Sequence, residues 1–506
     1  MMASRRIVDV AEGALARPTS EKGTADTTDR PPVALGRHRW LILAVLVAAQ
    51  FIVVLDAAVV NIALPSIQHA LDFSDTGLAW VINGYILTFG GFLLFGGRVA
   101  DLFGRKRMFL AGLGLFVVAS LACGVAVNSG ELVVFRAVQG LGAALLSPAA
   151  LSILTTTFTD RTERHAALGV WGAIGGVAAT FGVLAGGVLT AGAGWAWVFL
   201  INVPIGAALM AAAVVLRPDP RDRLRPQLDL LGAVLVTSSV CAFVYAVFRS
   251  TSVGWVAAST LGTLLGAVAL GAVFVGWERR SSHPLVPAAV FRRHIVGANL
   301  INLLVGAVLF STLFFLTLYL QRVLGYGPLL TGLAQLPLAT TQLLIAAIAG
   351  RLTTRIGYRS VLVAGLLGVA GSLTWLAQAR AQSHYVHGVL GPSILFGAGF
   401  SFALVALFIA GQAEVSGPLA GLASGLITTS FNVGGAVGLA VLGALAATHT
   451  AALAHTSTGA NVTPWALTAG FDRGWAIAAI CALAGVVLAV TVLPSRGDRI
   501  DTERPR

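Results

Sequence analysis

Two charged side chains, Asp56 and Arg136, stand inside otherwise apolar stretches of the sequence. An ionised residue at the centre of a bilayer costs about 2.5–3.5 kcal/mol on insertion scales, so each needs a partner or a function. Burial favours the neutral carboxylic acid and a nearby guanidinium favours the carboxylate, so relative movement of the two could bind and release a proton. We expect Asp56 to carry a proton under the control of Arg136. The alternative is a purely structural ion pair.

A glycine-containing segment, Gly97–Lys106, is the second candidate. It follows no predicted strand and lacks the Lys-Ser/Thr ending of a phosphate-binding loop, so we interpret it as a tight turn between helices. Asp101 is expected to pair with Arg105 or with a basic residue or helix N-terminus of another part of the chain. A solvated turn is the alternative to a conformational latch. The latch residues are Gly97, Asp101, Gly104, Arg105 and Lys106.

Metal or enzyme chemistry finds little support in the sequence. His384 and His387 have ligand-like spacing, but zinc sites need three or four ligands and no third lies nearby. The three cysteines are dispersed in apolar segments and indicate neither a disulfide framework nor a metal site. We therefore expect no cofactor, no metal and no enzyme activity.

Polar and aromatic residues inside the apolar segments are candidates for a substrate pathway. Each polar residue has a simpler alternative role, which is to hydrogen-bond a neighbouring helix, and the aromatic residues could merely pack. The candidates are Asn83, Tyr85, Gln139, Trp171, Asn299, Asn302, Phe314, Tyr319, Gln335, Gln342 and Asn432.

The composition predicts which kind of secondary structure holds these candidate residues. The chain has 506 residues, of which 57% are hydrophobic and 11% charged, and its mean hydropathy is +0.86. So few charges cannot cover a water-soluble particle of this size. The apolar runs are continuous rather than alternating, which predicts transmembrane helices and not a barrel.

About 20 helical residues cross a bilayer core, and on that basis the sequence predicts fourteen spans. They are 40–62, 76–97, 108–126, 131–156, 166–190, 195–216, 228–248, 254–277, 295–320, 328–350, 359–377, 385–411, 418–446 and 473–493. At 1.5 Å per residue, Asp56 lies about 9 Å and Arg136 about 8 Å from the external ends of their spans, so the two should share one layer.

Loop charges predict the orientation. With a cytoplasmic N-terminus, 28 of the 33 Lys and Arg residues fall on the cytoplasmic side and four on the external side. That bias follows the positive-inside rule and places both termini in the cytoplasm. Because loop charge accounts for the net charge of +12, no nucleic-acid partner is needed.

An internal repeat predicts the architecture. Gly97-Arg98 and Gly104 are matched, 253 residues later, by Gly350-Arg351 and Gly357, each time after the second span of a six-span group. Repeated halves around a central site are typical of secondary transporters. The predicted organisation is a disordered tail (1–39), a six-helix bundle (40–216), a linker with two extra spans (217–294), a second bundle (295–494) and a tail (495–506).

Several motifs together resemble the major facilitator superfamily, and within it the fourteen-span drug:proton antiporters. The segment Gly97–Lys106 is similar to the superfamily's signature loop. The other matching motifs are Leu55-Asp56…Val59-Val60-Asn61-Ile62-Ala63-Leu64-Pro65, Arg136-x-x-Gln139-Gly140-x-Gly142, Trp195-x-Trp197-x-Phe199-x-Ile201-Asn202-x-Pro204-x-Gly206 and Tyr319-Leu320-Gln321-x-x-x-Gly325-Tyr326-x-Pro328.

Two positions depart from the pattern of that group. Its antiporter motif has Gly-Pro before a glycine pair, whereas this chain has Gly182-Val183 before Gly186-Gly187. The Gly182-x-x-x-Gly186 spacing still allows close helix approach, but the missing proline counts against the antiport direction. Ala196 stands where the group often has Arg, and no change in function is attached to it.

The resemblance implies proton-coupled efflux of hydrophobic or amphipathic compounds, such as antibiotics, by a monomer in the cell membrane. The partners would be the small-molecule substrate, protons and lipid. The second half shows no acid in the middle of a span, which favours neutral or weakly charged aromatic substrates over dications. A proton-coupled nutrient uptake carrier on the same fold is the alternative, since fold alone does not set function.

Overall fold

The computed structural model describes residues 33–74, 77–158, 160–216, 229–281, 284, 293–380, 384–412, 419–454 and 464–494, and the elements in these segments are helices. The first part of the chain contains α1 (Val33–Ala70), α2 (Ala79–Phe103), α3 (Arg105–Gly124), α4 (Ser129–Thr157), α5 (Arg161–Gly192), α6 (Trp197–Leu200), α7 (Asn202–Ala212) and the short η1 (Ala213–Val215). The remainder contains α8 (Leu230–Val253), α9 (Ala258–Glu278), α10 (Arg293–Leu318), η3 (Tyr319–Val323), α11 (Pro328–Ile356), α12 (Tyr358–Leu376), η4 (Val386–Leu390), α13 (Gly391–Gln412), α14 (Leu419–Ala454) and α15 (Pro464–Val492).

Local chemistry accounts for several helix boundaries. At the start of α4, the Asn128 side chain accepts a hydrogen bond from the Glu131 backbone N–H at 2.9 Å, and the Glu131 carboxylate accepts one from the Val127 N–H at 3.1 Å. Reciprocal capping of this kind satisfies donors that the first helical turn leaves free. Pro328 opens α11, where a missing N–H costs nothing.

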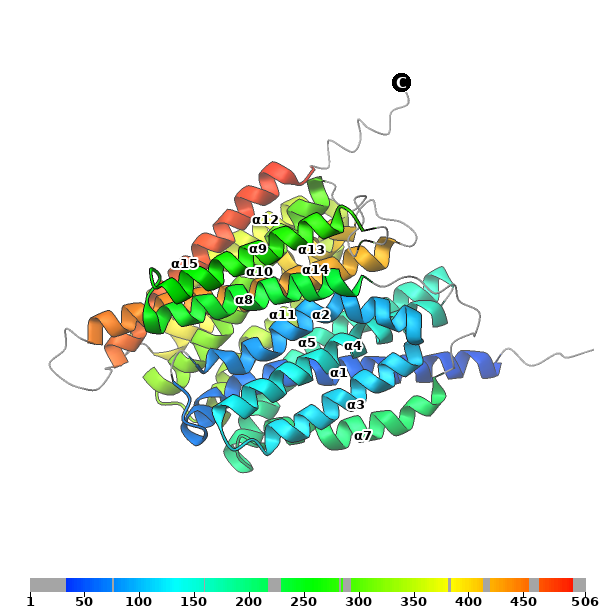
Figure 1. The fold of residues 1–506 in the computed structure, drawn as a ribbon, viewed down its shortest axis with the longest axis horizontal. Helices are drawn as coiled ribbons and strands as arrows, with labels where there is room; N and C mark the ends of the chain where they lie inside the picture. The colour runs from blue at the N-terminus through cyan, green and yellow to red at the C-terminus, as the bar shows by residue number, and fades with distance from the viewer. Residues whose placement is uncertain are drawn as a thin grey trace, which may run out of the picture.

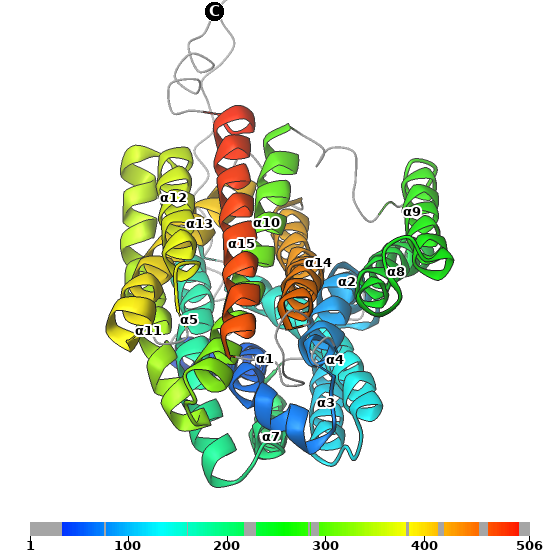
Figure 2. The same ribbon diagram turned by 90° about the vertical axis from the view of Figure 1, so that its left-hand side faces the viewer.

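The helices form two packed groups (Figures 1 and 2). Helices α1–α7 make up the N-terminal half and α10–α15 the C-terminal half. The halves meet mainly where α5 packs against α11 and where α2 packs against α14. Buried residues are overwhelmingly apolar in both halves.

The two turns of the internal repeat have the same backbone conformation. Gly104 joins α2 to α3 with φ 100° and ψ 130°, and Gly357 joins α11 to α12 with φ 89° and ψ 150°. This region of φ is sterically open to glycine and costly for other residues. The repeat seen in the sequence therefore corresponds to a repeated structural turn.

Helices α8 and α9 lie at the side of the molecule (Figure 2). Helix α8 contacts α2 and α14, while α9 packs mainly against α8. Only two residues of α9, Thr260 and Ala267, are buried. Helices α8 and α9 are therefore peripheral to the two packed groups.

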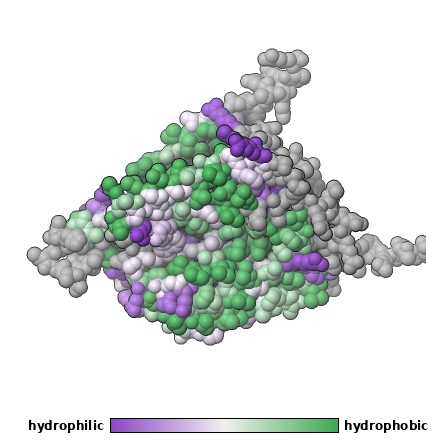
Figure 3. Space-filling view, viewed as in Figure 1, coloured by the Kyte–Doolittle hydropathy of each residue, from purple (hydrophilic) through white to green (hydrophobic). Residues whose placement is uncertain are grey.

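Twelve helices in the described segments are long and apolar enough to cross a membrane, and two shorter apolar stretches, Ala79–Leu93 and Val234–Val247, lie in α2 and α8. Hydrophobic residues cover most of the face seen in Figure 3, and hydrophilic residues lie mostly near its edges. An all-helical membrane protein is therefore confirmed.

Several predicted spans differ from the observed helices. The span predicted at 195–216 is divided into α6, α7 and η1, with Ile201 between α6 and α7 and with Pro204 in the first turn of α7. The span predicted at 473–493 begins earlier, at Pro464, so Asp472 lies inside α15 rather than at its boundary.

For orientation we name two ends of the molecule. The Phe73 face contains residues 71–74, 77–78 and 377–380, and the Gly104 face contains the turns at Gly104 and Gly357.

Candidate functional site

Asp56 and Arg136 form a buried ion pair in the N-terminal half. Nη1 of Arg136 lies 2.5 Å from Oδ2 of Asp56, and each residue is only 1% exposed. Asp56 belongs to α1 and Arg136 to α4. The predicted pairing of these two residues is confirmed.

A polar network surrounds the pair. Gln139, one turn after Arg136, accepts a hydrogen bond from Arg136 Nη1 at 2.6 Å and donates to Asp56 Oδ1 at 2.8 Å. Asn202, at the start of α7, also donates to Asp56 Oδ1 at 2.8 Å. Ser120 of α3 accepts from Gln139 at 2.5 Å and from Asn202 at 3.2 Å. Four helices thus contribute to one network that is shielded from solvent.

Backbone and aromatic groups hold the guanidinium in place. Nε of Arg136 donates to the Val81 carbonyl at 2.9 Å. The guanidinium carbon lies 4.4 Å from the ring centre of Tyr85 and 5.6 Å from that of Phe199, distances typical of cation–π contacts. The Tyr85 hydroxyl donates to the Val53 carbonyl at 3.2 Å, which ties α2 to α1. The arrangement can therefore stabilise a charge pair away from water.

Glycines of α5 bring that helix close to Asp56. A Cβ atom at Gly182 would stand 2.5 Å from the Ala58 Cβ and 3.1 Å from the Leu55 carbonyl oxygen, and one at Gly186 would stand 2.8 Å from the Val59 carbonyl oxygen. The close approach expected from the Gly182-x-x-x-Gly186 spacing is confirmed.

Gly187 belongs to a different contact. A Cβ atom there would lie 3.0 Å from the Leu329 Cα, and one at Gly332 would lie 2.7 Å from the Val183 carbonyl oxygen. These residues join α5 to α11 across the two halves, near the Phe73 face. Helix α5 is thus wedged between α1 and the other half.

The predicted turn is shorter than the segment Gly97–Lys106, because residues 97–103 continue α2, Gly104 alone makes the turn, and α3 begins at Arg105. Lys106 donates from Nζ to the Leu216 carbonyl oxygen at 2.6 Å and so connects this turn to the end of the η1 segment. Gly97 lies near Pro148 of α4. The side chain of Asp101 is outside the part of the structure described here, and its pairing stays a prediction.

The predicted pathway residues fall into two groups. Tyr85 and Gln139 belong to the Asp56 network. Asn302 donates to the Ile427 carbonyl at 2.6 Å, and Gln335 donates to Thr317 at 2.9 Å, so these two side chains join helices. Tyr319 donates to the Arg380 carbonyl at 2.8 Å.

The other pathway candidates are dispersed. Asn299 accepts from Ser430 at 2.9 Å, while Asn432 donates to the Thr428 carbonyl of its own helix at 2.8 Å. Asn83 is fully buried, and neither amide atom has a hydrogen-bond partner in the described structure. The three remaining candidates are Gln342, whose backbone carbonyl accepts from Ser401, the buried Phe314 and the partly buried Trp171. A role in substrate binding stays a prediction for all of them.

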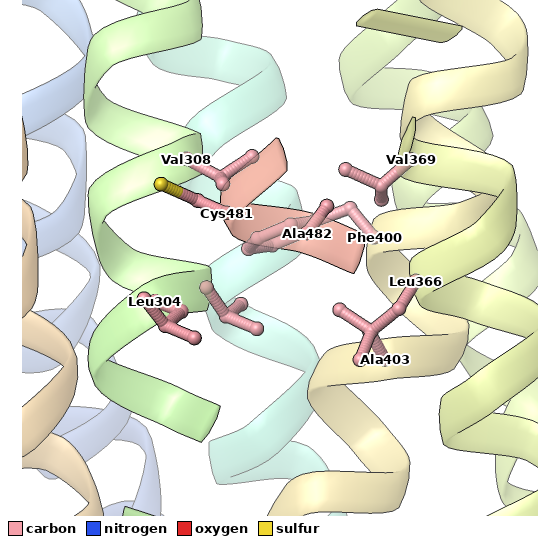
Figure 4. Close-up of a pocket in the computed structure, with 9 residues that line it drawn as sticks. Leu304, Val308, Leu366, Val369, Phe400, Ala403, Cys481 and Ala482 are labelled. Atoms are coloured by element: carbon pink, nitrogen blue, oxygen red, sulfur yellow. The ribbon is translucent and has the colours of Figure 1, made fainter. Parts of the chain in front are cut away.

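A small apolar cavity lies inside the C-terminal half (Figure 4). Its volume is about 10 Å³, about that of one water probe. Its walls come from α10, α12, α13 and α15 and include Val308, Leu366, Phe400 and Cys481. A space this small cannot hold a drug-sized molecule.

Two members of the Asp56 network, Ser120 and Asn202, were not predicted as site residues. Asn202 did appear in the motif from Trp195 to Gly206, but no role was attached to it. The signal that could have found both is their depth, since each lies about 9–10 Å from the external end of its predicted span at 1.5 Å per residue.

Comparison with characterised proteins places the chain among resistance and export proteins. It is 38% identical over 472 residues to the puromycin resistance protein pur8 of Streptomyces alboniger, covering 92% of this chain and 93% of that one. It is 38% identical over 459 residues to the cephamycin export protein CmcT of Amycolatopsis lactamdurans, covering 90% and 92%. The tetracenomycin C resistance and export protein of Streptomyces glaucescens is 34% identical over 421 residues, covering 83% of this chain and 78% of that protein.

Solved structures share the fold at low sequence identity. A POT family peptide transporter matches with a TM-score of 0.65 at 15% identity, covering 93% of this chain and 99% of that one. A bacterial homologue of the lysosomal transporter Spinster, in an inward-facing and occupied conformation, matches with a TM-score of 0.63 at 16% identity, covering 90% and 97%. The Major Facilitator Superfamily profile matches residues 46–439. With this match and the shared fold, the chain belongs to the Major Facilitator Superfamily of membrane transporters.

Proposed function

We propose that this protein exports hydrophobic or amphipathic compounds, such as antibiotics, in exchange for protons. The observation that carries the proposal is the buried carboxylate of Asp56, which is held by Arg136 and by two amide side chains. A charged pair sequestered in an apolar bundle is costly to bury, which makes it a functional candidate in a membrane protein. Similarity to proteins named for antibiotic resistance and export favours efflux over nutrient uptake.

The proposed topology has fourteen spans and cytoplasmic termini. The twelve long apolar helices and the two shorter apolar stretches together correspond to the fourteen spans predicted from the sequence. The strong excess of Lys and Arg on alternate loops supports a cytoplasmic Gly104 face and an external Phe73 face. In this orientation the protein would sit in the cell membrane as a monomer.

The proposed cycle uses Asp56 as the proton carrier. Proton uptake from the external side would neutralise Asp56, weaken its attraction to Arg136 and accompany drug release. Proton loss to the cytoplasm would restore the ion pair and reset the site. The inter-half contacts of Gly187 and Gly332 near the Phe73 face are consistent with a conformation closed on the external side.

The proposed substrates are neutral or weakly charged aromatic molecules. The prediction from sequence rested on the lack of a mid-span acid in the second half, but Asp472 lies inside α15, eight residues after its start. That position is about 12 Å along the helix at 1.5 Å per residue. Cationic substrates are therefore less strongly disfavoured than the sequence indicated.

The test is efflux from a host that lacks its own drug pumps. Cells expressing the protein should accumulate less ethidium and resist puromycin better than cells with an empty vector. A protonophore should remove the difference in ethidium accumulation, because it collapses the driving force. Greater accumulation on expression would indicate uptake and contradict the proposal.

A further inference from the structure

We propose that Asn202 is a positioning residue that keeps Asp56 hydrogen-bonded in both its ionised and its protonated form, by turning its side-chain amide. This inference rests on the proposed function in taking Asp56 as the proton carrier. It assigns to α7 a part in proton coupling.

The hydrogen bonds show which form of Asp56 the structure holds. Oδ2 accepts from Arg136, and Oδ1 accepts from both Gln139 and Asn202. The donors are a guanidinium N–H and two amide N–H groups, so both carboxylate oxygens act as acceptors. Asp56 is therefore surrounded by donors, which stabilise its ionised form.

The orientation of the Asn202 amide follows from that charge. Its Nδ2 donates to Asp56 Oδ1 at 2.8 Å and to Ser120 Oγ at 3.2 Å. Its Oδ1 is buried and has no hydrogen-bond partner in the described structure. In the reverse orientation Oδ1 would face the carboxylate oxygen, and two acceptors would repel each other. The unsatisfied Oδ1 is thus the consequence of holding an ionised Asp56.

Protonation of Asp56 creates a new donor that needs an acceptor. A buried polar group left without a partner is destabilising, because it has lost its hydrogen bonds to water and gained none. Arg136 offers only donors, and the Oε1 of Gln139 already accepts from Arg136 at 2.6 Å. The one uncommitted acceptor among the described side chains that contact Asp56 is Oδ1 of Asn202.

A half-turn of the Asn202 amide would present this acceptor to the carboxylic acid. The proton remains on Asp56, its O–H donates to Asn202 Oδ1, and no covalent bond other than the new O–H is formed. Before the turn, Ser120 accepts from both amides. After it, Nδ2 of Asn202 has moved away, and the Ser120 hydroxyl can donate its hydrogen to the turned Oδ1. Both forms of Asp56 are then satisfied.

The other titratable groups around the network are already engaged. Arg136 faces Asp56 from α4, Tyr85 of α2 donates to the Val53 carbonyl, and Cys123 of α3 lies with its sulfur 3.8 Å from Gln139 Oε1. On the side of α5, glycines approach α1 at this level. Among the side chains that the structure shows bonded to Asp56, Asn202 alone has an acceptor without a partner.

The test is infrared difference spectroscopy of the purified full-length protein between low and high pH, with the proton as the probe. The carboxylic acid band of Asp56 is identified by its loss in Asp56→Asn. In Asn202→Leu the ionised form loses a charge-assisted hydrogen bond and the neutral form loses a weaker one. The half-protonation pH should therefore rise by about one unit, a tenfold gain in proton affinity.

Asn61→Leu is the matched control. Asn61 is also a buried asparagine, on α1, but its Nδ2 donates to the Ala57 carbonyl of its own helix at 3.0 Å. This variant should leave the half-protonation pH of Asp56 unchanged. An Asn202→Leu protein that titrates like the wild type and the control would overturn the inference.

A second variant tests the turn itself and guards against misfolding of Asn202→Leu. In the wild type, a side-chain amide band should change together with the Asp56 acid band, because the Asn202 carbonyl gains hydrogen bonds. Asn202→Thr keeps a group that can donate and accept but has no amide, so this band should vanish. Persistence of the amide band in Asn202→Thr, or the lack of any Asp56-dependent band in the wild type, would refute the turn.

Efflux is measured separately in cells, which keeps the two proposals distinguishable. Normal drug efflux with unshifted spectra would overturn only the role of Asn202. A wild-type protein that moves no drug but shows the expected spectral shifts would overturn only the proposed function.

Discussion

The side chain of Gln321 donates a hydrogen bond from Nε2 to the backbone carbonyl of Ile62, 259 residues away, at 2.8 Å. Gln321 lies in the η3 segment that follows α10, and Ile62 lies in α1, three residues before Pro65. The bond therefore joins the two halves near the Phe73 face. Ile62 lies on the same helix as Asp56, about 9 Å further along that helix at 1.5 Å per residue.

Gln321→Leu should make the Phe73 face open more readily. Loss of one hydrogen bond costs about 0.5–1.5 kcal/mol, so the ratio of closed to open protein should fall by a factor of about two to ten. Asp72 and Gln378 are exposed on opposite halves at this face. Pulsed electron paramagnetic resonance between spin labels at these two positions gives a distance distribution, from which that ratio is obtained.

Gln68→Leu serves as the control for this experiment. Gln68 also lies near the end of α1, but its Nε2 donates within the same half, to the Phe73 carbonyl at 3.2 Å. Its loss should leave the distance distribution unchanged. An equal effect of both substitutions would show that the Gln321–Ile62 bond does not hold the halves together.

Asp56→Asn should abolish proton-driven efflux. The amide cannot carry the proton, and Arg136 loses its charged partner, which for a buried pair costs about 3–5 kcal/mol. Efflux and equilibrium binding of ethidium are compared in reconstituted vesicles with an imposed pH gradient. We expect transport to be lost while binding remains measurable.

Asp229→Asn is the matched control for Asp56→Asn. Asp229 is 6% exposed and caps α8, where it accepts hydrogen bonds from the Gly232 N–H at 2.7 Å and from Trp277 at 2.8 Å. It lies on the peripheral pair of helices, so the control should retain proton-driven efflux. Retained coupling in Asp56→Asn would remove Asp56 from the mechanism.

Arg136→Ala should change the pH dependence of transport. Without the guanidinium, the carboxylate of Asp56 loses its main stabilising charge, and the acid form persists to higher pH. Since efflux requires proton release to the cytoplasm, the pH profile should move to higher pH and the maximal rate should fall.

Arg136→Lys is the companion variant. It keeps the charge but loses the bond from Nε to the Val81 carbonyl. Its profile should lie between those of the wild type and Arg136→Ala. Identical profiles for all three proteins would indicate a purely structural ion pair.

Asp101→Asn should reduce transport while leaving expression intact. Asp101 lies in the last turn of α2, and the Gly104 turn that follows is anchored by the bond from Lys106 to the Leu216 carbonyl. If Asp101 pairs with the other half only in the outward-facing state, removing its charge shifts the equilibrium between states. The efflux rate at matched protein level measures the effect. Unaltered efflux would show that Asp101 is not part of a conformational latch.

The ion pair could be predicted from the sequence, but the complete network could not. Charged residues such as Asp56 and Arg136 are rare in an apolar span and therefore indicate a site. Serine and asparagine, the residue types at positions 120 and 202, also occur in spans where they only join neighbouring helices. Depth along the helix carries equal information for all four. Polarity alone therefore selected the pair, and only the tertiary contacts identified the remaining partners.

Helix ends were less predictable than helix positions. Residues 464–472 are less apolar than the rest of α15, so hydropathy ends the span before the backbone hydrogen bonds do. The break between α6 and α7 falls at Ile201, a local change that a hydropathy window averages out. The turn at Gly104 was predicted as part of a longer turn segment, whereas residues 97–103 are helical.

Gly182→Ala should impair folding or transport far more than Gly175→Ala, although both replace a glycine of α5. A Cβ at Gly182 would stand 2.5 Å from the Ala58 Cβ, whereas a Cβ at Gly175 meets no atom within 4 Å. Forcing extra volume into a packed contact typically costs about 1–3 kcal/mol. Because the displaced segment of α1 is next to Asp56, the strain should also reach the polar network. Thermal unfolding of the two purified variants, followed by efflux at matched expression, separates the effects: Gly175→Ala should behave as wild type in both. Equal melting temperatures and equal efflux for the two variants would mean that α5 need not lie so close to α1.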